Sequence, residues 1–332
     1  MNLTLAIPAH NDLDSLCHLL ACVQRLDCVA HVVVVDDGSD VPMTDEALLK
    51  ASGLHANQLT LLRHDTARGP GVARNLALAH VPTDYMLFLD ADDLPTRDLS
   101  YLLRDLDGEA FDFCLFQHHD TRMERKHSWG QTAHDQALWR AAGVDVGALN
   151  PVSPAAAAQL SRTANYPWNK IYRTEFLRDH AIGCSEIMVH EDIELHWRSF
   201  LNASRILASD RVGVIHVMHE TGSRLTNRSG PERLEVFGPL ERIATEIDTE
   251  IDAKGDGIYA LPFFSFAIGL FDWISGNLQP EYQDRLATLT GAFLRDHVPP
   301  ALLDDITGAD PALTARVLDQ AQDRVPRRRT PA

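Results

Sequence analysis

The stretch Met86-Leu87-Phe88-Leu89-Asp90-Ala91-Asp92-Asp93 places three carboxylates directly after an apolar run. The apolar run predicts a buried strand, and the carboxyl ends of such strands are where open α/β sheets bind ligands. Adjacent like charges repel one another unless a cation or a proton relieves the repulsion. Carboxylate oxygens suit Mg²⁺ or Mn²⁺, and such ions commonly hold substrate phosphates. An acidic helix start, capped by Asp93 or Asp98, is the structural alternative.

Strand and helix patterns alternate through the first hundred residues, which predicts a largely parallel sheet with right-handed crossovers. The expected strands cover residues 3–7, 31–35, 59–62 and 85–89, and the expected helices begin near residues 13, 44 and 72. The β-branched run at 31–35 is typical of a strand buried on both faces of a sheet.

The pattern is less regular after residue 107. Strands are expected at 111–117, 206–208 and 212–218, and helices at 174–180 and from His190 to about residue 202. Residues 122–164 suit a loop-and-helix insertion near a site. Further helices are expected at 234–251, 260–274, 282–296 and 311–321. The sequence therefore predicts a ligand-binding domain at 1–228, a helical region at 229–324 and a disordered basic tail at 325–332.

The composition excludes several classes of protein. A net charge of -17 argues against a nucleic-acid-binding surface, because phosphate backbones require clustered Lys and Arg. The five cysteines contain no CxxC pair, so zinc-ribbon and disulfide frameworks are excluded and reduced thiols are expected. The first residues resemble a strand rather than a signal peptide, and the apolar stretch 258–271 is too short to span a bilayer. We therefore expect a cytoplasmic protein without a transmembrane segment.

Four motifs follow predicted strands or open predicted helices, so a parallel sheet would bring them to one edge. They are Pro8-Ala9-His10-Asn11, Asp36-Asp37-Gly38-Ser39, Arg68-Gly69-Pro70-Gly71-Val72-Ala73-Arg74-Asn75 and Asp90-Ala91-Asp92-Asp93. Together they would supply carboxylates for a metal, donors for a base or ribose, and arginine for phosphate. An ordinary Asp-Gly-Ser turn is the alternative for the second motif. The third lacks the Gly-Lys-Ser/Thr ending of a P-loop, and Pro70 removes a donor.

In order and approximate spacing these motifs resemble the family 2 glycosyltransferases of the GT-A fold. The resemblance continues through Trp168-Asn169-Lys170-Ile171-Tyr172-Arg173 and His190-Glu191-Asp192, and it covers about residues 1–228. It is similar to bacterial enzymes that build capsule or lipopolysaccharide sugars. It implies an α/β GT-A fold with a mostly parallel sheet and a helical C-terminal extension.

The resemblance also implies a role for each motif. Asp37 would pair with a uracil ring, and Arg74 would meet the diphosphate or the sugar. Asp90 and Asp92 would meet the ribose and the metal-bound diphosphate, and Asp93 competes with Asp92 for the metal. The remaining nucleoside contacts would come from Pro8, Ala9, His10 and Asn11.

Asp192, with Glu191 beside it, would be the catalytic base. A positioned carboxylate accelerates attack by a sugar hydroxyl, and a divalent ion stabilises the departing diphosphate. One base on the face opposite the leaving group favours a single displacement with inversion. The alternative is that Glu191 and Asp192 only stabilise a helix N-terminus.

The expected protein is thus a metal-dependent, inverting glycosyltransferase that moves a sugar from a nucleotide-sugar, preferably a UDP-sugar, to a saccharide or lipid-linked acceptor in cell-surface polysaccharide synthesis. No Gln-x-x-Arg-Trp motif occurs, which favours one sugar per encounter. A catalytically silent nucleotide-sugar-binding partner is the main alternative, and a nucleotidyltransferase is a weaker one.

Some features leave several interpretations open. His216 or His219 is either a further metal ligand or a packed residue. His10 stands where the family commonly has Tyr, and Met218 where it often has Arg. The aromatic residues of 259–273 suit a helical core, a dimer contact or a membrane-surface patch. Arg327–Arg329 suit peripheral contact with the inner face of a membrane.

Overall fold

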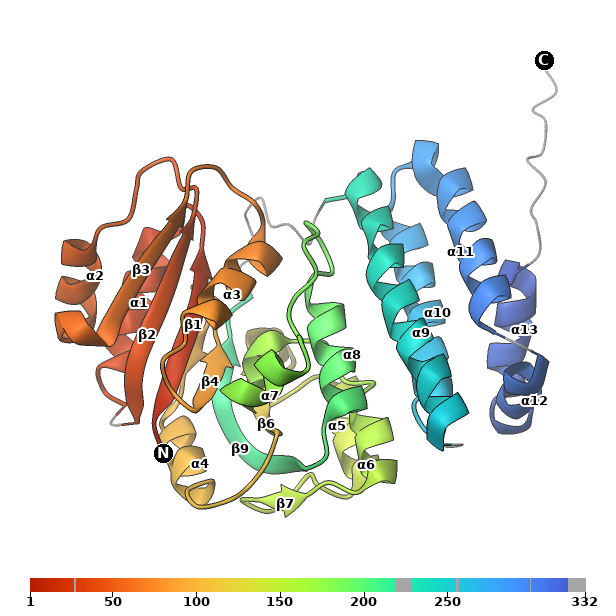
Figure 1. Ribbon diagram of the computed structural model, residues 1–332, viewed down its shortest axis with the longest axis horizontal. Coiled ribbons are helices and arrows are strands. Elements are labelled where there is room, and N and C mark those ends of the chain that lie inside the picture. The colour runs from red at the N-terminus through yellow and green to blue at the C-terminus, as the bar shows by residue number, and fades with distance from the viewer. Residues whose placement is uncertain (27, 219–227, 255–256, 299, 322–332) are drawn as a thin grey trace. The chain divides into compact units, whose positions relative to one another are not determined.

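The computed structural model describes residues 1–332 except 27, 219–227, 255–256, 299 and 322–332 (Figure 1). The chain divides into two compact units, Met1–Gly222 and Ser223–Ala332. The predictions for His219 and for the basic tail at 325–332 fall outside the described residues. The domain limits inferred from the sequence remain a prediction.

In the first unit, nine strands of the described chain form one sheet in the order β3-β2-β1-β4-β8-β6-β9-β5, with β7 paired to β9. The strands are β1 (Leu3–Ala9), β2 (Val29–Asp37), β3 (Leu59–His64), β4 (Tyr85–Phe88), β5 (Leu94–Pro95), β6 (Phe113–Asp120), β7 (Asn150–Pro151), β8 (Lys170–Arg173) and β9 (Ile206–His216). Strands β1, β2, β3, β4, β6 and β9 run in one direction, and the short β5, β7 and β8 run against them. The predicted, mostly parallel sheet is confirmed.

One expectation about strands was wrong, and one strand was not expected. The strands expected at 206–208 and 212–218 form one strand, β9, which ends at His216. Ser209 still pairs with Phe116 of β6, and a register shift past Asp210 and Arg211 then pairs Val212 with Gln117. The segment 170–173 is also a strand, β8, which enters antiparallel between β4 and β6. Both features depend on pairing with distant strands, which a local hydrophobic pattern does not encode.

The helices of the first unit are α1 (Leu13–Val23), α2 (Asp45–Ser52), α3 (Pro70–Ala79), α4 (Arg97–Asp105), α5 (Ala133–Ala142), α6 (Pro154–Leu160), α7 (Thr174–Asp179) and α8 (Asp192–Asn202). Their ends follow capping chemistry. For α2, the Thr44 hydroxyl accepts the Ala47 amide at 3.3 Å, and Gly53 ends the helix with φ 63°. Residues 122–164, expected as a loop-and-helix insertion, contain a 3-10 helix, α5, β7 and α6.

The core is built on both faces of the sheet because successive side chains of a strand point to opposite faces. One apolar cluster includes Leu3, Leu5 and Ile7 of β1, Leu16, Leu19 and Leu20 of α1, and Leu99, Leu102 and Leu103 of α4. The helix α3 packs against β1 and β2. Burial of each leucine contributes about 1.5–3 kcal/mol.

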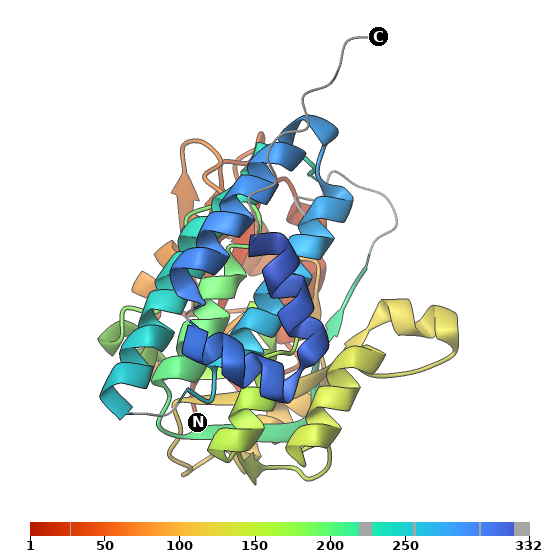
Figure 2. The same cartoon turned by 90° about the vertical axis from the view of Figure 1, so that its right-hand side faces the viewer.

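The second unit is helical, as expected. It contains a 3-10 helix at Pro231–Val236 and the helices α9 (Phe237–Lys254), α10 (Ala260–Asn277), α11 (Gln283–His297), α12 (Pro300–Ala309) and α13 (Pro311–Ala321). Helices α9, α10 and α11 lie side by side (Figures 1 and 2), and stacked phenylalanines such as Phe237 and Phe271 fill the space between them. The sequence did not predict α12, whose buried apolar residues are only Leu302 and Ile306. In the described part of the chain, no helix combines the length and the apolar character needed to cross a membrane.

Candidate active site

The site lies at one edge of the sheet in the first unit. The six strands that share a direction all end there. Polar residues lie at the end of each of these strands or shortly after it. This edge carries four of the segments predicted to meet: the ends of β1, β2 and β4 and the start of α3. It also carries the ends of β6 and β9, because both run in the same direction as β4.

The loop after β1 is tied to the loop after β2. Pro8 and Ala9 close β1, and the exposed His10 places its Nδ1 2.8 Å from the Asp37 carbonyl. The Asn11 amide donates to the Ser39 hydroxyl at 2.9 Å, and the Asn11 side chain accepts the Asp40 amide at 2.8 Å. These bonds hold Asn11 in the left-handed conformation, with φ 53°. The predicted nucleoside loop is therefore a rigid element at the site edge.

Asp37 anchors the loop that leads into α3. Its two carboxylate oxygens accept the backbone amides of Arg68 at 2.9 Å and Gly69 at 2.8 Å, and one lies 2.7 Å from Nδ1 of His64. A carboxylate has about four acceptor positions, so one remains for a ligand N–H. The pairing of Asp37 with a uracil ring remains a prediction, and the structure adds a structural role that the sequence did not reveal.

The Gly71-to-Asn75 motif of α3 holds the loop that precedes α8. The Asn75 side chain donates to the Cys184 carbonyl at 2.8 Å and accepts the Cys184 amide at 2.9 Å. Gly71 lies against the same loop, where an added Cβ would come within 2.2 Å of the Ser185 carbonyl oxygen. The motif therefore positions the segment that ends at Asp192.

We expect Gly71→Ala to lower the free energy of unfolding by about 1–3 kcal/mol, because the new methyl group forces α3 and the 184–191 loop apart. The control is Gly269→Ala in α10, where an added Cβ meets no described atom within 4 Å. That change should instead stabilise the helix by up to about 1 kcal/mol. Urea unfolding of both variants measures the difference. Equal stability of Gly71→Ala and wild type would show that the loop does not pack closely against α3.

Arg74 forms the central ion pairs of the site. Its Nη2 donates to Asp90 at 2.6 Å and its Nη1 to Glu191 at 2.7 Å. Burial disfavours the guanidinium cation, but the charges of Asp90 and Glu191 raise the pKa of Arg74 above its ordinary value. Arg74 is 5% exposed. Its two ion pairs connect the segment after β4, which carries Asp90, to the start of α8, which follows Glu191. Its expected contact with phosphate or sugar remains a prediction.

Asp93 and Asp92, adjacent in sequence, are in different environments. Asp93 is fully buried, lies 2.9 Å from Nδ1 of His216 and accepts the Val217 amide at 2.9 Å. Burial raises the pKa of Asp93 to about 6. Asp92 is only partly buried. Asp93 therefore joins the segment after β4 to the end of β9. Asp92 is more accessible than Asp93 and is better placed to bind an external ligand.

Among the residues that the structure describes, no three His, Cys, Asp or Glu side chains converge as a ready metal site. Asp90 and Asp92 nevertheless suit Mg²⁺ or Mn²⁺, which proteins often hold with one or two carboxylates while substrate phosphates complete the coordination. The donor set thus fits a metal that arrives together with a diphosphate.

Asp192 opens α8 two residues after His190, whose φ of 69° marks a sharp turn of the chain. Burial raises the pKa of Asp192 to about 7, and the neighbouring charge of Glu191 adds to the increase. Glu191, at the N-cap position, makes no side-chain capping hydrogen bond, and its carboxylate pairs with Arg74 instead. A general base needs a pKa near the working pH, which Asp192 has, and its role as the base remains a prediction.

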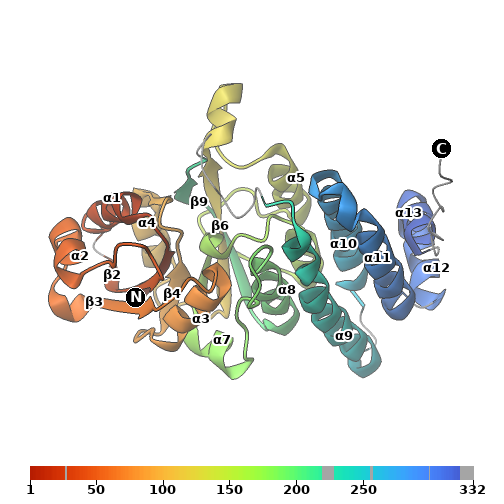
Figure 3. The same cartoon turned by 90° about the horizontal axis from the view of Figure 1, so that it is seen from above.

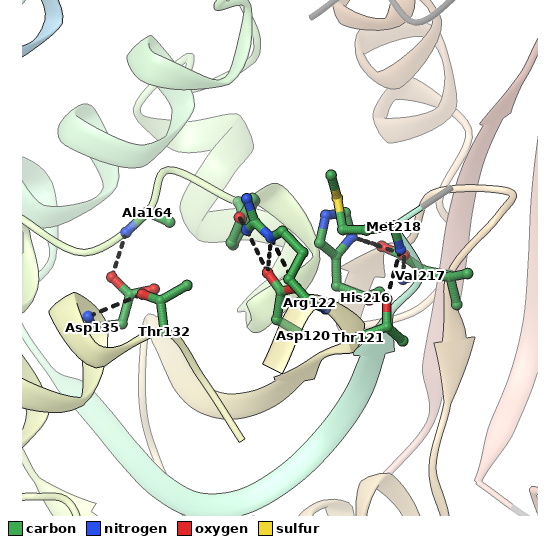
Figure 4. A network of polar contacts seen from close by, with 11 residues as sticks. Asp120, Thr121, Arg122, Thr132, Asp135, Ala164, His216, Val217 and Met218 are labelled. Carbon is green, nitrogen blue, oxygen red and sulfur yellow. Dashed lines mark hydrogen bonds and ion pairs between the residues drawn. The ribbon is translucent and has the colours of Figure 1, made fainter. Parts of the chain in front are cut away.

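The sequence analysis missed Asp120, Thr121 and Arg122, which lie at the end of β6 beside His216 of β9. Asp120 pairs with Arg122 through two 2.9 Å contacts from Nε, and the Thr121 hydroxyl donates to the His216 carbonyl at 3.2 Å (Figure 4). His216 also stacks on the buried Trp168 ring at 4.9 Å. The signal was present in the sequence, because polar residues end the apolar strand at His118-His119-Asp120 just as they end β4.

Fold and site together define an α/β protein of the GT-A-like class with a helical C-terminal region, as the resemblance implied. The chain belongs to glycosyl transferase family 2, because the model of that family, described as "Glycosyl transferase family 2", matches residues 4–180. The family predicted from the sequence motifs is therefore confirmed.

Individual relatives extend the comparison. The chain is 28% identical over 263 residues to the poly(ribitol-phosphate) beta-N-acetylglucosaminyltransferase TarS of Staphylococcus aureus, covering 74% of this chain and 40% of that protein. It is 35% identical over 96 residues to a pre-mycofactocin glycosyltransferase of Mycobacterium tuberculosis, covering 29% and 19%. The chain thus spans less than half the length of these two curated relatives.

A solved structure shows the same fold over nearly the whole chain. The crystal structure of S. aureus TarS 1-349 in complex with UDP-GlcNAc matches with a TM-score of 0.71 and 21% sequence identity, covering 97% of this chain and 89% of that one. Because the match includes residues beyond the family model, the likeness in fold extends to the helical region.

Proposed function

We propose that this protein is a metal-dependent, inverting glycosyltransferase that transfers one sugar per encounter from a UDP-sugar to a saccharide or lipid-linked acceptor in cell-surface polysaccharide synthesis. One observation carries the proposal: Arg74 joins Asp90 of the acidic motif to Glu191, the residue before Asp192. A carboxylate with a pKa of about 7 thereby lies in the same site as carboxylates suited to a metal-bound diphosphate. The UDP and acceptor parts are supported by the similarity to TarS, which binds UDP-GlcNAc in its crystal structure and is named a poly(ribitol-phosphate) beta-N-acetylglucosaminyltransferase.

In this mechanism Asp192 takes the proton from the attacking acceptor hydroxyl. Its pKa near 7 leaves a large fraction ionised at neutral pH, and the raised value makes it a stronger base than a solvent-exposed aspartate. Arg74 and Glu191 hold the start of α8, so they keep the Asp192 carboxylate in place. A single base on this face favours inversion at the transferred carbon.

Asp90 and Asp92 would hold the divalent metal together with the diphosphate of the donor. When bound, the metal would act as a Lewis acid that stabilises negative charge on the leaving group. Asp93 would act indirectly, because its contacts to His216 and Val217 fix the turn that presents Asp92. The free cysteines among the described residues are compatible with a cytoplasmic location.

The test is calorimetric titration of UDP and GDP into the purified protein, with Mn²⁺ and then with EDTA. We expect UDP to bind with Mn²⁺ and to bind at least tenfold more weakly with EDTA, and we expect GDP to bind more weakly than UDP. Preference for GDP would overturn the assignment of Asp37 to uracil. Absence of binding by either nucleotide would contradict the proposed donor class.

Asp92→Ala should abolish the Mn²⁺ dependence of UDP binding, because one of the two carboxylates proposed for the metal is lost. The matched control is Asp179→Ala at the exposed end of α7, which should bind UDP as wild type does. The measurement is the ratio of UDP affinities with Mn²⁺ and with EDTA. A ratio unchanged in Asp92→Ala would remove Asp92 from the metal site.

A further inference from the structure

A short basic segment leaves the sheet at the site edge. Residues 121–129, here called the basic arm, begin with a 3-10 helix at Thr121–Lys126, turn at His127 with φ 51° and return through Ser128 and Trp129. In Figure 3 this yellow segment extends outward beyond the end of β6. The function proposed above assigns no role to this segment.

The base of the arm is firmly attached beside the site. The Asp120 amide donates to the Gly130 carbonyl at 3.1 Å, and the Gly130 amide donates to Nδ1 of the buried His119 at 3.0 Å. The Thr121 hydroxyl also reaches the His216 carbonyl at 3.2 Å, and His216 contacts Asp93 (Figure 4). The arm is therefore fixed relative to the acidic motif at the end of β4.

The charge of the arm is opposite to that of the whole chain. The chain has a net charge of -17, whereas the arm contains Arg122, Arg125 and Lys126 against one acidic residue, Glu124. Arg122 pairs with the buried Asp120, and Glu124 lies 3.1 Å from Nε2 of His119. Arg125 and Lys126 are both exposed. A local positive charge on an acidic protein attracts anions.

The arm also presents an aromatic surface. Trp129 is 61% exposed, and one face of its ring stacks on His119 with the centroids 3.6 Å apart and an interplanar angle of 13°. The stacking and the hydrogen bonds of His119 hold the indole in one orientation. The opposite face is thus available to a flat apolar surface, such as the C–H face of a sugar ring, at low entropic cost.

We propose that the basic arm binds a polyanionic glycan as the acceptor: Trp129 stacks on a sugar ring, and Arg125 and Lys126 pair with phosphate or carboxylate groups along the chain. This inference rests on the proposed function, because it names the class of acceptor for the same site. An anionic membrane surface is the rival partner. We favour the glycan because the fixed aromatic face lies beside the site rather than on an apolar face that could enter lipid.

The test is binding of defined probes by affinity electrophoresis at several salt concentrations. The probes are phosphorylated dextran, a hyaluronan oligosaccharide, neutral dextran and phosphatidylglycerol vesicles. We expect one or both polyanionic glycans to bind, with affinity that falls as salt rises, and dextran to bind at least tenfold more weakly. The two polyanions distinguish phosphate from carboxylate. Binding of the vesicles alone, or of no polyanion at about 20 mM salt, would overturn the proposal.

Variants assign the binding to the arm. The double variant R125Q/K126Q should weaken polyanion binding at least tenfold and reduce the slope of log affinity against log salt by about one or more. Trp129→Ala should weaken binding several-fold without changing the slope, because it removes stacking but no charge. The matched control is Lys50→Gln, an exposed lysine in the last turn of α2, which should behave as wild type does.

Two further measurements distinguish failure of this inference from failure of the proposed function. The urea midpoint of each arm variant should equal that of wild type, which shows that the fold is intact. UDP binding should also be unchanged in the arm variants. If wild type binds UDP and polyanion but the arm variants keep full polyanion affinity, only the acceptor inference is wrong. If wild type binds no UDP, the proposed function fails whatever the arm does.

Discussion

Replacing Asp192 by asparagine should lower the rate of sugar transfer about 100-fold or more while UDP affinity stays nearly the same. The amide keeps the size of the side chain but cannot accept the proton of the acceptor hydroxyl, and loss of a general base costs about 10²–10⁴ in rate. Donor binding should persist, because Arg74 still pairs with Asp90 and Glu191. The measurement is UDP release from the UDP-sugar on which wild type is most active, together with calorimetric UDP titration.

The pH dependence of the transfer rate is an independent test of Asp192 as the base. Asp192 takes a proton only when ionised, and its pKa of about 7 means that the wild-type rate should rise with pH and level off above neutrality. The residual rate of Asp192→Asn should lack this rise. The control Asp179→Asn, at the exposed end of α7, should keep both the wild-type rate and the wild-type profile. Normal transfer by Asp192→Asn would mean that another group is the base.

Replacing Arg74 by methionine should produce the largest loss of stability, about 3 kcal/mol in the free energy of unfolding. Methionine fills much of the space of the buried arginine but leaves Asp90 and Glu191 without their cation. Removing one partner of a buried ion pair costs about 3–5 kcal/mol. We expect the lower end of that range, because the Asp90 and Glu191 side chains are 28% and 14% exposed and water can solvate part of their charge.

Urea unfolding measures this loss, and Arg97→Met at the exposed start of α4 is the control, expected within about 0.5 kcal/mol of wild type. Arg74→Lys separates charge from geometry. A lysine restores the cation but cannot donate to two carboxylates in the planar arrangement of a guanidinium, so an intermediate stability is expected. A loss below about 1 kcal/mol in Arg74→Met would show that the ion pairs contribute little to holding α3, β4 and α8 together.

Much of the fold could be predicted from the sequence because its signals are local. The β-branched run of β2 and the apolar spacing of α1 each extend over a few residues, and each predicts an element that the structure contains. The alternation of these elements predicts the parallel half of the sheet. Strand β8 carried no such signal, since its antiparallel position depends on pairing with residues far away in the chain.

In the candidate site too, the sequence determines some features and only the tertiary structure decides others. The sequence by itself determined which carboxylates end buried strands, and so which groups gather at one edge: Asp37, Asp90, Asp92 and Asp93. Only the tertiary structure decided how these charges are balanced. Arg74 pairs with Glu191 across 117 positions, and His216 pairs with Asp93 across 123. The reason is physical: local backbone preferences place a side chain at a strand end, but its charge partner and its pKa depend on which distant segment is packed against it and on how far that packing excludes water.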